Sequence, residues 1–307
     1  MTNPSAIAVS GLEKHYGATR AVDGVSFDVA PGEVFGLLGP NGAGKTTTVE
    51  ILEGYRRPDA GTVRVLDCDP QRDASLRSRM GVMLQEGGLY PALRARELLR
   101  LFAAYYEDPE DADTLLDTVG LTDAAGTPVR RLSGGQAQRL SLACAIVGRP
   151  DVVFLDEPTA GMDPQARTAT WGLVRDLAAR GATVLLTTHA MDEAEHLCDR
   201  VAIMAGGRLA ALGTPAELTQ SATASDVWFA AVPGLDTDAL AHALSLDGTC
   251  VVEERPGEYL IRAPATAGIV ADLTAFLRDR DVMVSSLRAG RQSLEAVFLQ
   301  ITAESQP

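Results

Sequence analysis

The sequence predicts an α/β protein with a mainly parallel, doubly wound sheet, followed by a small α+β domain. Three observations support this fold class. Short apolar runs alternate with helical patterns up to residue 218. A small polar stretch at 219–226 then indicates a linker. Beyond it the pattern becomes strand–helix–strand–strand–helix–strand, which is the order of a ferredoxin-like domain.

The elements before the linker are expected in a clear order. Residues 25–29 alternate apolar and polar side chains, as a half-buried strand does. Residues 34–38 are continuously apolar, which is typical of a strand buried on both faces. The remaining expectations are strands at 6–12, 62–67, 152–156 and 183–188, a hairpin at 201–213, and helices at 45–53, across most of 93–121, from about Ser133, and before 180–181.

The elements after the linker are shorter. The last helix, 293–302, has apolar residues at i, i+3, i+4 and i+7, so it packs against either its own domain or a partner subunit. The sequence therefore predicts a first domain at 1–221, with a helical subdomain at about 86–147, and an accessory domain at 222–307. Within the latter we expect strands at 227–231, 249–254, 258–262 and 282–288, and helices at 236–245 and 266–279.

Composition excludes some classes of function. The net charge of −14 argues against a broad nucleic-acid surface, which needs a basic face. No stretch has the length and apolar character of a membrane span, and the N-terminus has no secretion signal. We therefore expect a separate chain to supply any spans. The cysteines lack metal-ligand spacing and are expected to be free thiols: Cys68, Cys144, Cys198 and Cys250.

A glycine-rich loop joins the buried run 34–38 to the helix that begins at Lys45. The segment GPNGAGKT matches the phosphate-binding pattern GxxxxGK[ST]. Its backbone N–H groups can converge on phosphate oxygens, with Lys45 at the β- and γ-phosphates and Thr46 on Mg²⁺. A plain glycine turn would not explain the lysine. The candidate nucleotide-binding residues are Gly39, Pro40, Asn41, Gly42, Ala43, Gly44, Lys45, Thr46 and Thr47.

Two carboxylates follow the apolar run 152–155. Asp156 and Glu157 lie at the carboxyl end of that strand, where doubly wound sheets bind ligands. Alone, such a pair is usually a solvated strand end. With a phosphate loop upstream, Asp156 is expected to hold Mg²⁺ and Glu157 to act as the general base on a water molecule.

The segment RLSGGQAQRLSLA (131–143) decides among nucleotide hydrolases. Ser133 and Gln136 form a capping-box pattern, and Gly134 and Gly135 leave the helix N-terminus bare for a phosphate. Here the chain resembles the ATP-binding-cassette (ABC) ATPases, whose signature motif it carries. The resemblance implies a P-loop cassette with a mixed-sheet core and a helical subdomain. It also implies a head-to-tail dimer that holds two ATP molecules.

Other residues match this family by position. Tyr16 matches the aromatic residue that stacks on adenine, and Gln85 the glutamine that senses Mg²⁺, takes part in catalysis and faces the membrane partner. Asp163, in AGMDP, matches the loop through which the subunits communicate. His189 matches the histidine that contacts the γ-phosphate. Without the other motifs, Tyr16, Gln85 and His189 would be interpreted as structural residues.

The resemblance covers about residues 5–220 and implies an ATPase that energises a separate permease. The segments TTTVEILEGYRRPDAG and SLEAVFLQIT are similar to exporter ATPases of the daunorubicin-resistance type. Export of drugs or other hydrophobic compounds, at the cytoplasmic face of a bacterial membrane, is the expected role. The alternative is a soluble ABC switch with a cytosolic target. A kinase or GTPase is disfavoured because the guanine-reading NKxD motif is absent and the segment Ser133–Gln136 would have no use in either. The accessory domain either stabilises an assembly contact or binds a regulatory ligand.

Overall fold

The structure is a computed structural model that describes residues 5–85, 87–221, 226–289 and 293–304. It divides into two compact units, Met1–Pro215 with Phe298–Pro307, and Ala216–Val297. This division differs from the predicted boundary at 221/222 in two ways: residues 216–221 group with the smaller unit, and the second half of the end helix groups with the larger one. In the described ranges, no helix combines the length and apolar character needed to cross a membrane.

A six-stranded sheet forms the centre of the larger unit, in the order β5-β6-β7-β3-β8-β9. Every neighbouring pair is parallel except β8–β9, which forms the predicted hairpin. The middle strands are buried throughout, as their continuous apolar runs predict. The strands are β3 (Val34–Leu38), β5 (Met80–Met83), β6 (Val152–Asp156), β7 (Thr183–Thr188), β8 (Arg200–Ala205) and β9 (Arg208–Gly213).

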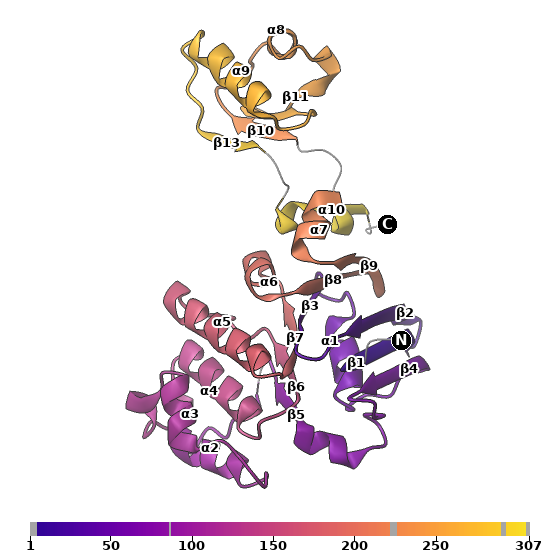
Figure 1. The fold of residues 1–307 in the computed structure, drawn as a ribbon, viewed down its shortest axis with the longest axis vertical. Helices are drawn as coiled ribbons and strands as arrows, with labels where there is room; N and C mark the ends of the chain where they lie inside the picture. Colours follow the sequence, from indigo (N-terminus) through magenta and orange to yellow (C-terminus); the bar gives the residue numbers. More distant parts are fainter. Residues whose placement is uncertain (1–4, 86, 222–225, 290–292, 305–307) are drawn as a thin grey trace. The chain divides into compact units, whose positions relative to one another are not determined.

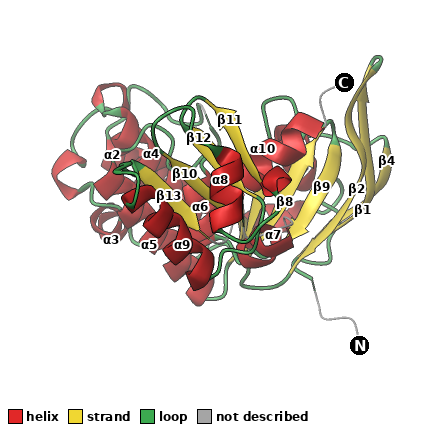
Figure 2. Cartoon of the chain, turned by 90° about the horizontal axis from the view of Figure 1, so that it is seen from above, coloured by secondary structure: helices red, strands yellow, loops and turns green. Residues whose placement is uncertain are grey.

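A separate antiparallel sheet, in the order β2-β1-β4, holds the N-terminal strands. Its strands are β1 (Ile7–Tyr16), β2 (Thr19–Val29) and β4 (Ala60–Val65), and they lie beside the β8–β9 edge (Figures 1 and 2). Helix α1 (Lys45–Leu52) lies between the two sheets (Figure 1). Phe27 stacks on Phe35 at 5.1 Å between ring centroids, which joins the sheets in one core.

The larger unit also carries a group of helices after β5. Ser133 caps α4 with the predicted capping box: its hydroxyl accepts from Gln136 N, and Gln136 Oε1 accepts from Ser133 N. Asp163 caps the next long helix through its side chain, which accepts from Ala166 N. The helices are α2 (Ala95–Ala103), α3 (Ala112–Thr118), α4 (Gly134–Ile146), α5 (Pro164–Ala179) and α6 (Met191–Leu197).

The smaller unit contains a four-stranded antiparallel sheet in the order β11-β12-β10-β13, with two helices. The last strand begins later than the predicted 282. Residues 219–221 end helix α7 (Pro215–Ser221) rather than belonging to a linker, and 222–225 lie outside the described residues. The elements of the smaller unit after α7 are β10 (Val227–Ala230), α8 (Thr237–Ala243), β11 (Val251–Arg255), β12 (Glu258–Ile261), α9 (Ala267–Arg278) and β13 (Ser286–Ala289). The end helix α10 (Leu294–Glu304) begins in this unit, and its residues from Phe298 group with the larger one.

Candidate functional site

The sheet order brings three of the predicted segments to one edge. Strands β6, β7 and β3 are parallel neighbours, so their carboxyl ends lie side by side. The phosphate loop follows β3, Asp156 ends β6, and His189 follows β7 directly. The adjacency of these segments therefore comes from strand pairing, as the doubly wound fold predicts.

The phosphate loop needs glycine at specific positions. Gly44 caps α1 in a left-handed conformation, with φ 100°, and a Cβ there would lie 2.2 Å from the carbonyl oxygen of Ala21. A Cβ at Gly39 would also collide with backbone, at 2.5 Å. The Lys45 ammonium donates to the carbonyl oxygens of Gly39, at 2.7 Å, and Pro40, at 3.1 Å. The loop thus curls around the lysine and leaves no room for side chains on these glycines.

The electrostatics of Lys45 connect the loop to the acidic pair. Burial lowers the pKa of the Lys45 ammonium, while the charges of Glu157 and Asp156 act in the opposite direction. One cation and two carboxylates therefore share this edge of the sheet. An edge with both signs of charge and a bare helix N-terminus can hold a phosphate with its metal ion.

Glu157 is held by contacts with several segments. Its Oε2 lies 2.7 Å from Nδ1 of His189, and its side chain is only 11 % exposed against 74 % for the histidine. Its backbone is left-handed, with φ 53°; its N–H donates to Thr187 O at 3.1 Å, and its carbonyl accepts from Gln138 Nε2 at 2.8 Å. Thr187 also donates to Asp156. A left-handed conformation at a non-glycine residue costs free energy, so the surrounding hydrogen bonds stabilise it here.

The signature segment lies apart from the phosphate loop of the same chain. No hydrogen bond within the described part of the chain joins Ser133, Gly134, Gly135 or Gln136 to that loop. The segment instead lies near the loop before Asp163, since a Cβ on Gly135 would be 3.6 Å from the side chain of the buried Met162. Ser133, Gly134 and Asp163 are exposed, so this surface faces outward.

The other predicted residues lie around the edge. Tyr16 ends β1 with 43 % of its surface exposed, and the Arg56 guanidinium lies 5.6 Å from its ring centroid. Thr46 is exposed and Thr47 half-buried on the first turn of α1. Gln85, two residues after β5, is exposed. Each therefore has a surface that a ligand or partner can reach.

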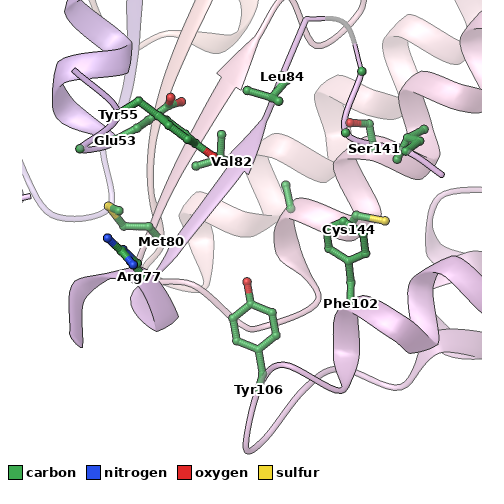
Figure 3. Close-up of a pocket in the computed structure, with 15 residues that line it drawn as sticks. Glu53, Tyr55, Arg77, Met80, Val82, Leu84, Phe102, Tyr106, Ser141 and Cys144 are labelled. Atoms are coloured by element: carbon green, nitrogen blue, oxygen red, sulfur yellow. The ribbon is translucent and has the colours of Figure 1, made fainter. Parts of the chain in front are cut away.

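A groove of about 610 Å³ lies next to Gln85, and Figure 3 shows its lining. Glu53 and Tyr55 come from the segment that follows α1, β5 forms the floor, and residues of α2 and α4 lie opposite. The walls are largely apolar. The lining residues are Glu53, Gly54, Tyr55, Arg77, Met80, Val82, Leu84, Gly87, Gly88, Leu89, Phe102, Tyr106, Ser141, Cys144 and Ala145.

Glu53 should make stability depend on pH. Burial, with the charges of Asp156 and Glu50, raises the pKa of its carboxyl to about 8, from 4.5. The folded protein therefore keeps a proton that the unfolded chain loses above pH 4.5, so stability falls as pH rises from 4.5 towards 8. We expect Glu53→Gln to raise the melting temperature at pH 8 more than at pH 5. Equal shifts at both pH values, or the same effect from Glu107→Gln at an exposed site, would contradict this.

Sequence reasoning missed two carboxyl groups near the site. Glu53 carries no signal, because its environment is made by segments distant in sequence. Glu193 on α6 is buried, with 1 % exposure. Its spacing of four residues from the buried Leu197 puts both on the inner face of the helix, and this spacing could have singled it out.

Comparisons with known proteins agree with this geometry. The family model described as ABC transporter matches residues 22–160. A Nod factor export ATP-binding protein I of Ralstonia nicotianae is 39 % identical over 96 % of this chain and 93 % of its own length. Daunorubicin resistance ATP-binding protein DrrA3 of Streptomyces coeruleorubidus is 37 % identical over 98 % of this chain and 96 % of its own length. A solved ATP-binding subunit of an ABC transporter has a TM-score of 0.65 at 30 % identity, covering 70 % of this chain and 92 % of its own.

Proposed function

This chain belongs to the ABC transporter family of ATP-binding subunits, whose activity is ATP hydrolysis, and we propose that it energises export through a permease on a separate chain. The observation that carries the proposal is the meeting of the phosphate loop, Asp156, Glu157 and His189 at one edge of the sheet. The match to two export or resistance proteins along almost the whole chain supports the direction of transport.

Each residue at the edge has a proposed role in hydrolysis. Lys45 and the loop amides hold the phosphates, and Tyr16 stacks on adenine. Glu157 accepts a proton from the attacking water, and His189, 2.7 Å away, orients that carboxylate. Thr46, Gln85 and Asp156 are the proposed Mg²⁺ ligands, and their hydroxyl, amide and carboxylate oxygens fit this ion. When bound, Mg²⁺ offsets negative charge on the phosphates.

The exposed signature surface supports a dimer. Ser133, Gly134 and the neighbouring Asp163 face outward rather than towards their own phosphate loop. We propose that they bind the nucleotide on a second copy of the chain, head to tail. Each copy then completes the site of the other, which couples ATP binding to closure of the dimer.

The groove beside Gln85 is the proposed contact with the permease. Exposed large apolar side chains, Tyr55 and Leu84, line it, and a groove of this kind suits a short helix of a membrane protein. Binding there would keep the chain at the cytoplasmic face of the membrane. If Gln85 moves when nucleotide binds, the permease segment in the adjoining groove would then move with it.

The groove proposal has a direct test. The candidate permease is purified in lipid vesicles with this chain, and ATP hydrolysis is compared with and without it. Tyr55→Asp should abolish stimulation by the permease, because it places a charge in an apolar contact. Tyr105→Asp is the matched control: Tyr105 is 74 % exposed, Tyr55 72 %, and Tyr105 is not among the lining residues. Equal stimulation of both variants would refute this docking site.

The same assay addresses the cargo and the alternative role. The names of the relatives specify different molecules, a Nod factor and daunorubicin, so we propose only that the cargo is a drug or other hydrophobic compound. Stimulation by one class of compound would identify it. Hydrolysis that ignores every membrane protein would instead favour a soluble switch with a cytosolic target.

A further inference from the structure

A buried carboxylate lies behind the catalytic edge, outside the set of residues assigned to hydrolysis. Glu193, on α6, is 1 % exposed. Its Oε1 accepts hydrogen bonds from Thr159 Oγ1 at 2.8 Å and from Trp171 Nε1 at 3.1 Å. The hydroxyl of Thr188 also lowers the pKa of this carboxyl group. Donors from two other segments therefore converge on one side chain of α6.

The hydrogen bond between Thr159 and Glu193 joins two segments that carry proposed catalytic groups. Thr159 is two residues after Glu157, in the loop that leads to Asp163. Glu193 lies on α6, four residues after His189 in the sequence. The carboxylate of Glu193 thus links the loop after β6 to the segment after β7. The other donor, Trp171, comes from the middle of α5, which carries no proposed catalytic group.

Burying an ionisable group in this position costs free energy, so the group is expected to do more than fill space. Burial raises the pKa of the Glu193 carboxyl, while hydrogen bonds from Thr188, Thr159 and Trp171 lower it. A leucine or methionine would pack in the same volume without the cost of burying a carboxyl. What such residues could not do is hold two loops at a fixed separation through hydrogen bonds with defined directions.

We propose that Glu193 is a positioning residue: its carboxylate holds the segment of Glu157 and Asp163 in register with the segment of His189. The inference rests on the proposed hydrolysis of ATP and extends it. Because Glu157 and His189 lie 2.7 Å apart, a small shift between the two loops would separate the base from its neighbour. When the dimer closes, a movement of the loop that carries Asp163 would also reach His189 through Thr159 and Glu193.

The test removes the two donors, Thr159 and Trp171, one at a time from the 307-residue chain. Thr159→Val deletes the link between the loops while keeping the shape of the side chain. We expect kcat for ATP hydrolysis to fall about tenfold, with KM for ATP within about twofold, because a positioning error affects the transition state more than binding. Thr159→Ser keeps the hydroxyl and should restore most of kcat. Trp171→Phe deletes the donor from α5 and should lower thermal stability but keep kcat within about twofold.

Hydrogen exchange of backbone amides supplies a second readout. Thr159→Val should speed exchange in residues 188–192 as well as in its own loop, whereas Trp171→Phe should speed exchange in α5. Equal kcat in wild type and Thr159→Val, or an equal loss of kcat in Thr159→Val and Trp171→Phe, would overturn the positioning role while leaving the ATPase intact. A wild-type chain without ATP hydrolysis would instead overturn the proposed function and the inference together.

Discussion

Replacing Glu157 by Gln is expected to lower ATP hydrolysis by at least about 10²-fold, which is within the range for loss of a general base. The amide has nearly the same size as the carboxylate but cannot accept the proton of the attacking water. The backbone contacts that hold residue 157, with Thr187 and Gln138, do not involve its side chain and should persist. The loss should therefore be in turnover and not in folding.

Nucleotide binding should survive this change. Lys45 and the loop amides lie between β3 and the first turn of α1, and the substitution leaves them in place. Removing the negative charge of Glu157 also removes one repulsion against the phosphates. Equilibrium binding of a fluorescent ATP analogue and single-turnover hydrolysis measure the two effects separately. The turnover rate of Glu157→Asp, whose side chain is one methylene shorter, should lie between those of the wild type and Glu157→Gln. Near-normal turnover by the Gln variant would remove Glu157 from its proposed role.

The meeting of the phosphate loop, Asp156 and His189 at one edge of the sheet could be predicted because its determinants are local. The buried runs 34–38, 152–156 and 183–188 lead directly into the phosphate loop, the Asp156–Glu157 pair and His189, and parallel pairing then aligns the ends of the runs. The capping box at Ser133 is also local, since Ser133 and Gln136 are three residues apart. Such signals depend on neighbours in sequence, so a single chain is enough to read them.

Features that depend on distant partners could not be read in this way. The separate antiparallel sheet requires β1 to pair with both β2 and β4, and breaks in register after Val9 interrupt the alternation that would identify its full length. The left-handed conformation of Glu157 is fixed by Thr187 and Gln138, which lie far along the chain. The pKa of Glu53 likewise depends on tertiary burial and on Asp156. Pairing across long separations leaves little trace in local patterns.

Replacing Gly134 by Asp should abolish hydrolysis while leaving the chain folded and able to bind ATP. Gly134 is the first residue of α4 and is exposed, and a Cβ added to it would meet no other atom within 4 Å. An aspartate at a helix N-terminus is favourable to the helix, so the monomer should keep its melting temperature. In the proposed dimer, however, this position faces the phosphates of the second copy's nucleotide, and a carboxylate there would repel them.

The effect should be clearest in the Glu157→Gln background, where bound ATP persists. In that background, we expect light scattering to show that ATP converts the chain to a dimer. The added Gly134→Asp change should keep the chain monomeric, with its affinity for ATP within about threefold of the Glu157→Gln protein. Gly172→Asp is the matched control, since Gly172 is an exposed glycine on α5 where an added Cβ would also meet open space. The Gly172→Asp variant should form the dimer with ATP as the Glu157→Gln protein does. Dimers of unchanged stability in the Gly134→Asp protein would show that the signature helix does not bind nucleotide across the interface, because two carboxylates added beside two polyphosphates could not be neutral to that contact.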